Sequence, residues 1–430
     1  MGGKDYEFGG PIGTGVLMLI LPPISHYLHF LITPRGAPPP EFWSAPLETL
    51  KSVTPTFSSL FSLHATLAVA AYYLLLVALM YVLPAEIAEG VVLKDGSRLK
   101  YRCNAFTTFL VFFTFLGTMT VLEGPTWWFW SYLTDNFAQL QSASIVFSYA
   151  MSLWVYIRSY RPMPKGKEVI LSPVGFKGNH IHDFWMGREL NPRIGEWLDI
   201  KQLHELRPGL MGWILFNLAW TVKQYNTHGF VSDSIVLVNL FETWYVVDAL
   251  WNESKVLTTM DITTDGLGVM LLFGNAVWVP FMYCLQARYL ASFPVHLGLL
   301  GIAGVLAVQF TGYAIFRGAN NQKNAFRTNP ADPAVSHLKF MTTKSGSKLL
   351  ISGWWGVARH VNYFGDWIMA WSYCLTTGFN TPLTYFYVIY FGILLLHRDR
   401  RDEAKCREKY GKDWDRYCKV VKWRIIPGIY

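Results

Sequence analysis

Residues 60–83 read LFSLHATLAVAAYYLLLVALMYVL, an apolar run in which His64 is the one strongly basic or acidic side chain. As a helix the run would extend about 36 Å at about 1.5 Å per residue, more than the roughly 30 Å hydrocarbon core of a bilayer. A helix also pairs its own backbone N–H and C=O groups, as lipid requires. The run lacks the strict alternation of a barrel strand. It therefore predicts a membrane-spanning helix.

Similar runs recur along the chain, so we expect an all-α polytopic membrane protein with about ten transmembrane helices. The candidate spans are 12–32, 60–83, 105–123, 140–158, 209–224, 232–251, 267–287, 294–316, 350–376 and 382–396. Most residues whose side chains could take part in catalysis or ligand binding lie late in the chain. We therefore expect residues 1–180 to supply packing helices and loops, and residues 181–430 to form a catalytic region with a ligand-binding tail.

The composition excludes an ordinary soluble protein. Hydrophobic residues make up 52% of the chain and charged residues only 15%, against about 25% charged in soluble proteins. Much of the net charge of +8 lies in the last thirty residues and in short loops, which is typical of a cytosol-facing membrane protein and does not indicate a nucleic-acid partner. The scattered cysteines predict neither a disulfide framework nor a zinc site. They are Cys103, Cys284, Cys374, Cys406 and Cys418.

Two further local features concern the spans at the start and in the middle of the chain. The first ten residues lack the basic region of a secretory signal, so we expect the first span to be retained. Gly298, Gly301 and Gly304 recur at intervals of three in another span, and small residues at such spacing favour close helix packing. We expect these glycines to form a packing face.

Two predicted spans carry polar residues, which are costly in lipid and therefore indicate function. Residues 244–253 read WYVVDALWNE, and in a helix Asp248 lies one turn from Tyr245 and four residues before Asn252. An acid paired with a base at a helix end is the alternative. Residues 352–366 read SGWWGVARHVNYFGD; so many polar groups cannot all face lipid and must line a wet or ligand-filled cavity.

The C-terminal tail and the segment around Lys323 could together bind an anionic ligand. Taken as one helix, the tail places a mixture of acids, bases and rings on one face, which suits a nucleotide-sized ligand; contact with lipid headgroups is the alternative. Lys323 and Arg327, four apart, would share one side of a helical turn and suit a phosphate; alternatively they are ordinary loop cations. The tail face consists of Asp402, Cys406, Lys409, Tyr410, Asp413 and Tyr417.

Other binding motifs are weak. The cluster His180, His182 and Asp183 lies in a polar loop, where such groups gather by chance, so we predict no metal site. No G-x-G-x-x-G follows a predicted strand, so a dinucleotide would have to bind in a helical cavity.

Several long motifs, in order, resemble the sterol reductase family, which includes the delta(14) and delta(7) enzymes and the membrane half of the lamin B receptor. The resemblance is dense over residues 180–430 and looser before them, and it is closest to the delta(14) type. The motifs include GRELNPR at 187–193, YVVDALWNE at 245–253, NAFR at 324–327, and the segments 349–366 and 395–430.

The resemblance implies an NADPH-binding site in the C-terminal half. Carried over residue by residue, that site falls on Lys323, Arg327, Leu350, Trp355, Asn362, Tyr363, Asp402, Cys406, Arg407, Glu408, Lys409, Tyr410 and Tyr417.

The resemblance also implies reduction of the C14–C15 double bond of a sterol biosynthesis intermediate. An unactivated alkene is not electrophilic, so an acid must first protonate C-15, and hydride from NADPH then reaches C-14. The acid must stay protonated at neutral pH, which burial favours. We expect the sterol to enter from the bilayer, among membrane lipids, and we expect no obligatory protein partner. The candidate proton-delivery residues are Tyr245, Asp248 and Glu253, with Asp399 and Tyr417 behind them.

Three other readings remain open. The chain could reduce the delta(7) bond, or bind sterol without catalysis. The residues around Arg359, His360 and Asn362 and the basic tail are also similar to the membrane isoprenylcysteine methyltransferases, which use S-adenosylmethionine. The family implies the endoplasmic reticulum for a eukaryotic member and the plasma membrane for a bacterial one.

Overall fold

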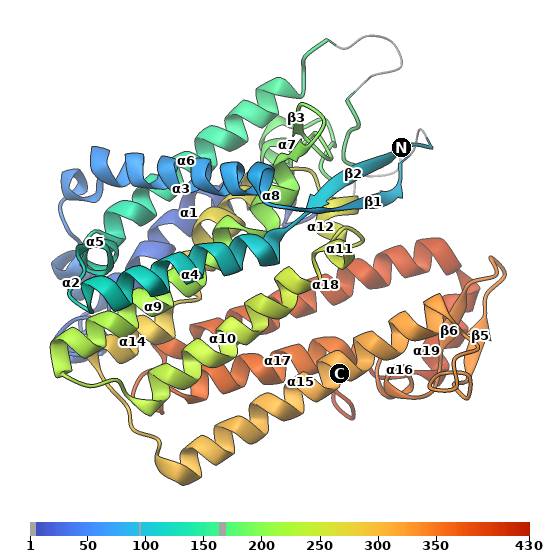
Figure 1. Cartoon of the computed structure of the whole chain (residues 1–430). Coiled ribbons are helices and arrows are strands. Elements are labelled where there is room, and N and C mark those ends of the chain that lie inside the picture. The colour runs from blue at the N-terminus through green and yellow to red at the C-terminus, as the bar shows by residue number, and fades with distance from the viewer. Residues whose placement is uncertain (1–5, 94–95, 163–168) are drawn as a thin grey trace. The chain divides into compact units, whose positions relative to one another are not determined.

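The computed structural model describes residues 6–93, 96–162 and 169–430, and the chain forms two compact units, Met1–Pro294 and Val295–Tyr430 (Figure 1). The predicted all-α polytopic membrane fold is confirmed: helices dominate both units. These units are defined by packing, whereas the predicted boundary after residue 180 separates regions by function and stays a prediction. In the described ranges, seven helical segments are long and apolar enough to cross a membrane. They are Gly10–Phe30, Phe57–Val82, Ala105–Glu123, Phe137–Arg158, Asp233–Trp251, Val269–Ser292 and Gly298–Thr328.

The predicted count of ten is not confirmed, and the three remaining spans have different outcomes. Residues 209–224 lie in helix α9 (Pro208–His228). The predicted span 382–396 begins at the short turn η4 (Leu383–Tyr385) and continues into the first half of α18 (Phe386–Tyr410). The prediction of one helix over 350–376 is wrong. Gly353 has a φ of 63°, a left-handed conformation that glycine tolerates, and it precedes a short turn of helix and a second break at His360.

The first unit packs its helices around a buried core, with short strands at its polar edge. Its elements are α1 (Gly10–Phe30), η1 (Pro40–Trp43), α2 (Pro46–Val53), η2 (Phe57–Leu60), α3 (Leu63–Val82), β1 (Glu86–Val92), β2 (Arg98–Cys103), α4 (Ala105–Glu123), α5 (Trp128–Asp135), α6 (Phe137–Arg158), α7 (His180–Met186), β3 (Arg193–Ile194), β4 (Leu198–Asp199), α8 (Ile200–Leu206), α9, α10 (Asp233–Trp251), α11 (Glu253–Val256), α12 (Met260–Thr263), α13 (Val269–Phe273), the π-helical η3 (Gly274–Met282) and α14 (Leu285–Ser292). β1 pairs antiparallel with β2, and β3 with β4.

The GRELNPR motif begins at a backbone crossing. Gly187 has a φ of 83° and caps α7. A Cβ on Gly187 would lie 2.3 Å from the carbonyl carbon of Leu267 and 2.5 Å from that of Gly266. A Cβ on Gly268 would lie 2.3 Å from the Gly187 nitrogen. The two segments therefore touch through their main chains, which requires glycine on both sides.

We expect Gly187→Ala to lower the free energy of unfolding by about 1–3 kcal/mol, because alanine resists the positive φ and its Cβ would clash with backbone atoms that cannot move aside. The measurement is the thermal midpoint of the purified protein in detergent. Gly195→Ala is the matched control, since Gly195 also has a positive φ, 65°, but a Cβ added there would have nothing within 4 Å. Equal shifts in both variants would show that the crossing adds nothing beyond the φ strain.

The second unit is an α-helical assembly with one hairpin. Its elements are α15 (Gly298–Thr328), β5 (Phe340–Thr342), β6 (Lys348–Leu350), α16 (Trp354–Val357), α17 (Val361–Leu375), η4 (Leu383–Tyr385), α18 and α19 (Lys412–Val420). β5 and β6 pair antiparallel. Helices α15 and α17 lie side by side along much of their length (Figure 1).

Glycines set the distance between α15 and α17, but they are not the glycines that the sequence indicated. A Cβ on Gly365 would lie 2.5 Å from the Phe316 nitrogen and 2.7 Å from the Gly312 oxygen. The helices therefore cross with their backbones in contact. The predicted packing face at Gly298, Gly301 and Gly304 is wrong: a Cβ on Gly304 meets nothing within 4 Å, and one on Gly301 meets only the side chain of Leu297.

Candidate functional site

The crossing of α15 and α17 brings the last turns of α15 beside the first turn of α17. Helix α15 continues through Thr328, so Lys323 and Arg327 share a helical segment, as predicted. The polar residues after Arg317 stay helical because one side of this segment packs: Ala319 and Phe326 are buried in a cluster with Leu350 and Trp355. On the other side, Asn324 and Arg327 are exposed.

Lys323 lies against an aromatic ring. Its Nζ is 3.8 Å from the centroid of the Trp355 indole, a close cation–π contact. The indole nitrogen of Trp355 donates to the Ala319 carbonyl at 2.8 Å, which fixes the ring. Asp402 and Cys406 on α18 lie close enough to Lys323 to interact with it electrostatically. Arg327, one turn on, is exposed.

The start of α17 provides three polar side chains around this position. The Tyr363 hydroxyl donates to the Asp402 carboxylate at 3.0 Å, and the His360 ring stacks on Tyr363 with centroids 4.8 Å apart. The Asn362 amide donates to Asn320 Oδ1 at 3.3 Å. In the described part of the chain, the buried Asn362 Oδ1 has no hydrogen-bond partner. A buried acceptor left in this state is costly, so a ligand donor at this atom would satisfy it.

The tail residues form two groups, because the predicted single helix over 402–417 is wrong. Gly411, with a φ of 50°, ends α18, and α19 begins at Lys412. Cys406, Tyr410 and Tyr417 still pack into one cluster. Asp413 is not part of this cluster, and its carboxylate accepts from the Lys344 backbone N–H at 2.6 Å.

The remaining predicted tail residues face solvent. Arg407, Glu408 and Lys409 are exposed on α18. Arg407 pairs with Glu403 at 2.8 Å and with Asp415 at 3.2 Å. The exposed cations at this end of the unit could pair with phosphate groups, whereas the rings and the Asn362 amide could receive a planar group.

Burial keeps two ionisable tail groups in their neutral forms. It raises the pKa of the Tyr417 hydroxyl above its ordinary range and raises the pKa of the Cys406 thiol to about 11. Tyr417 is therefore a phenol at neutral pH and can donate a proton in a hydrogen bond. Cys406 is a thiol rather than a thiolate.

Asp399 is the centre of a buried network that the sequence did not reveal. Its carboxylate accepts from Arg424 Nε at 2.7 Å and from the Tyr430 hydroxyl at 3.2 Å, and His360 Nε2 lies 3.5 Å away. These partners are up to 39 residues away in the chain, and no periodicity links them. Asp399 is therefore an acceptor for Arg424 and Tyr430, and it lies beside His360, which stacks on Tyr363.

The other three predicted catalytic residues belong to the first unit. Tyr245 and Asp248 are half-buried on α10, and the Tyr245 ring lies 6.2 Å from that of Trp213. Glu253 is buried and accepts from the Ala105 N–H at 2.7 Å, Gln202 Nε2 at 2.8 Å and Arg207 Nη1 at 3.0 Å. Both of its oxygens thus act as acceptors, which describes a carboxylate that organises the start of α4. The catalytic role of all five residues stays a prediction.

A buried acid in the middle of α10 was not among the predicted residues. Glu242 accepts from Trp213 Nε1 at 2.7 Å and from Asn217 Nδ2 at 2.5 Å, both on α9. An acid inside a predicted span was the available signal, but Glu242, unlike Asp248, lies outside the longer motif at 244–253.

Comparison with known proteins places this arrangement in a family. The profile of the "Ergosterol biosynthesis ERG4/ERG24 family" matches residues 2–430. The chain is 43% identical to the Delta(14)-sterol reductase of Septoria lycopersici, over 99% of this chain and 96% of the relative. It is 47% identical to Delta(14)-sterol reductase erg24 of Schizosaccharomyces pombe, over 99% and 97%. It is 44% identical to Delta(14)-sterol reductase LBR of Gallus gallus, over 98% of this chain and 64% of that protein. The chain therefore belongs to the ERG4/ERG24 family of sterol reductases, membrane oxidoreductases of sterol biosynthesis.

Proposed function

We propose that this chain reduces the C14–C15 double bond of a sterol intermediate with NADPH. The printed names of its relatives support the bond that is reduced. The observation that carries the cofactor proposal is that several predicted NADPH residues, far apart in sequence, lie close together in the second unit. Lys323 lies on Trp355, Asp402 and Cys406 interact with Lys323, and Tyr363 donates to Asp402. The eukaryotic relatives support the endoplasmic reticulum as the membrane.

The residues present fit a nicotinamide dinucleotide. Lys323 is a cation held on the Trp355 indole, and the exposed Arg327, Arg407 and Lys409 could pair with phosphate oxygens. Asn362 Oδ1 is a buried acceptor that a carboxamide N–H would satisfy. When bound, NADPH supplies the hydride; the side chains around it provide position and charge.

The proton has to come from the chain. An alkene accepts hydride only after protonation, so an acid must remain protonated until the sterol is in place. Tyr417 meets this condition because a phenol is protonated at neutral pH, and burial raises the pKa of its hydroxyl further. The other proposed proton-delivery residues are Tyr245, Asp248 and Glu253 of the first unit and Asp399 of the second.

The test is product analysis. Purified protein is incubated with an 8,14-diene sterol and NADPH, and the product is identified by gas chromatography and mass spectrometry. We expect a product heavier by two hydrogens, saturated at C-14, and formed only with NADPH. Reduction of a 7-dehydrosterol instead would move the activity to the delta(7) bond. Turnover of neither sterol would contradict the proposal, and sterol binding without NADPH oxidation would then favour the non-catalytic reading. Membership of a reductase family argues against the methyltransferase reading.

Lys323→Met is expected to weaken NADPH binding roughly 10- to 150-fold, because a charge-assisted contact contributes about 1.5–3 kcal/mol. Methionine keeps the length and packing of the side chain. The measurement is isothermal titration calorimetry with NADPH alone. Lys419→Met is the matched control, since Lys419 is an exposed lysine on α19 outside the proposed site. An unchanged dissociation constant in the Lys323 variant would remove Lys323 from the site.

A further inference from the structure

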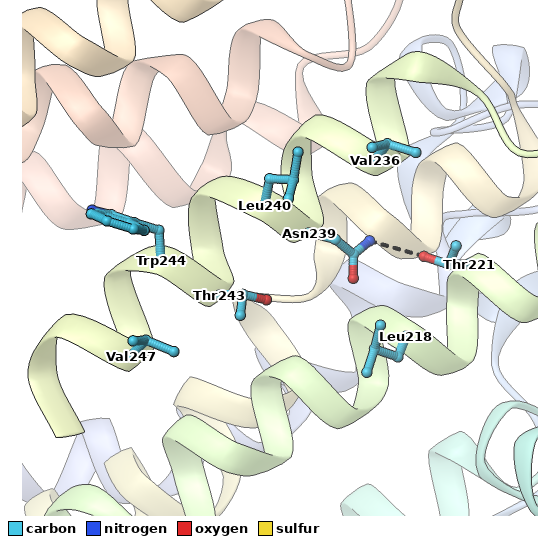
Figure 2. Close-up of a pocket in the computed structure, with 8 residues that line it drawn as sticks. All are labelled: Leu218, Thr221, Val236, Asn239, Leu240, Thr243, Trp244 and Val247. Carbon is cyan, nitrogen blue, oxygen red and sulfur yellow. Dashed lines mark hydrogen bonds between the residues drawn. The ribbon is translucent and has the colours of Figure 1, made fainter. Parts of the chain in front are cut away.

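A groove runs between α9 and α10 on the first unit. It has a volume of about 410 Å³, within the range of about 300–1,000 Å³ typical of small-molecule sites. Figure 2 shows Asn239 and Thr221 facing each other across it, with Leu218 beside them and Trp244 and Val247 farther along α10. Its lining consists of Leu218, Thr221, Val236, Asn239, Leu240, Thr243, Trp244 and Val247.

The groove opens where a bilayer molecule can reach it. Helix α10 is one of the membrane-spanning candidates. On its open side Leu240 is 59% exposed and Trp244 is 54% exposed, and such large apolar side chains are stable against lipid rather than water. The lining contains no charged residue. An occupant must therefore be predominantly apolar and uncharged where it contacts the groove.

Three polar residues interrupt these apolar walls: Asn239, Thr221 and Thr243. Asn239 Nδ2 donates to the Thr221 hydroxyl at 2.9 Å and to the Ile235 carbonyl at 2.8 Å, and the Thr221 hydroxyl itself donates to the Asn217 carbonyl at 2.9 Å. This chain of donors fixes the amide orientation, because a carbonyl oxygen can only accept. Among the described residues, the buried Asn239 Oδ1 is left without a hydrogen-bond partner. Asn239 Oδ1 is thus an unsatisfied acceptor in the groove lining, and one hydroxyl of an occupant would satisfy it.

The groove is separate from the proposed proton-delivery residues of α10. Val236, Leu240, Thr243 and Val247 recur at steps of four, three and four, so they share one face of the helix. Tyr245, two residues after Thr243, lies on the opposite face, where its ring approaches Trp213. A molecule in the groove would therefore contact the face of α10 opposite Tyr245.

We propose that the α9–α10 groove is an accessory sterol site, in which the rings and tail of a bilayer sterol lie on the apolar walls and its hydroxyl donates to Asn239 Oδ1. A sterol combines a rigid apolar body with one hydroxyl, which is the chemistry that this lining matches. A phospholipid headgroup would require cations that the lining lacks. The inference goes beyond the proposed reaction and does not depend on it.

Photolabelling tests this site directly. The full chain in phosphatidylcholine vesicles is irradiated with a photoreactive sterol that carries a 3β-hydroxyl, and the labelled peptides are identified by mass spectrometry. We expect label on α9 and α10 residues of the groove. A competing sterol with the hydroxyl should displace the label about fivefold more effectively than the same sterol without it, since one neutral hydrogen bond contributes about 1 kcal/mol.

Two variants test the geometry by different means. Leu218→Trp fills the groove, and Asn239→Leu removes the acceptor; each is expected to reduce groove labelling at least about fivefold. Leu153→Trp is the matched control, because Leu153 is 51% exposed on α6 and outside the groove. Thermal midpoints show whether each variant is folded. If the Leu218 variant does not fold, labelling of the Asn239 variant alone tests the accessory sterol site.

Two other results would contradict the accessory sterol site. Undiminished labelling in both variants, or equally strong labelling of the same peptides by a photoreactive phosphatidylcholine, would make the groove a general lipid contact. A crosslink from the groove to a second copy would make it a subunit interface. Labelling is measured without NADPH, so the two proposals can fail separately. A labelled groove with no sterol reduction would contradict only the reductase proposal. Sterol reduction with an unlabelled groove would contradict only the accessory sterol site.

Discussion

Asp248→Asn is expected to lower kcat by about 100- to 10,000-fold, the range over which a positioned general acid contributes, and to leave the NADPH dissociation constant unchanged. Asparagine keeps the shape of the side chain but cannot transfer a proton to C-15. The backbone role of Asp248, whose carbonyl accepts from Asn252 at the end of α10, is preserved. Single-turnover reduction of an 8,14-diene sterol at saturating NADPH measures the effect.

The matched control for this substitution is Asp135→Asn. Asp135 forms an exposed ion pair with Lys223 at 3.0 Å, and such pairs contribute about 0–1 kcal/mol, so turnover should be unchanged. A kcat in the Asp248 variant equal to that of the control would exclude Asp248 as the acid. Glu253→Gln needs separate treatment, because it weakens the buried pair with Arg207 and can lose activity through instability. Its turnover is therefore interpreted only with its thermal midpoint.

Gly365→Leu is expected to separate α15 from α17 and to abolish measurable NADPH binding. Even a Cβ at Gly365 would lie 2.5 Å from the Phe316 nitrogen, and overpacking costs about 1–3 kcal/mol and occasionally more. The lost contact is also the one that holds Lys323 on α15 beside Asn362 and Tyr363 on α17. Calorimetric titration with NADPH and the thermal midpoint are the two measurements.

Gly304→Leu provides the comparison on the same pair of helices. A Cβ on Gly304 meets nothing within 4 Å, so leucine there meets no fixed atom and gains helix propensity. We expect a thermal midpoint equal to or above that of the unsubstituted chain, with NADPH binding retained. If both variants behave alike, the close approach at Gly365 is not what positions the cofactor residues.

The sequence predicted membrane helices well where length and apolarity decide the structure, as in residues 60–83. It failed where a glycine with a positive φ interrupts a predicted helix: Gly353 lies just before α16, and Gly411 separates α18 from α19. Gly353 and Gly411 both have a positive φ at such a break, and for Gly411 the warning was present, because a glycine after a lysine-rich turn is a common helix end. The prediction for 350–376 gave too much weight to apolar content and too little to this break.

The candidate site was predicted only in part. The helical pairing of Lys323 and Arg327 follows from local spacing, and it is confirmed. The packing glycines were misplaced because close approach depends on the partner helix, which the sequence of one helix does not specify. For the same reason the contact of Asp399 with Arg424, 25 residues later, could not be predicted. No helical or strand spacing links the two positions.

The length of α15 has a consequence for how the reactants meet. Its 31 residues extend about 46 Å at about 1.5 Å per residue, roughly 16 Å more than a hydrocarbon core. The surplus turns are those that carry Lys323 and Arg327. The helix is therefore long enough to reach from the lipid into the aqueous phase. In the proposed reaction, NADPH would be exchanged from the aqueous phase without entering the lipid, and the sterol would stay in the lipid. The two reactants, with opposite solubilities, need not share an entrance.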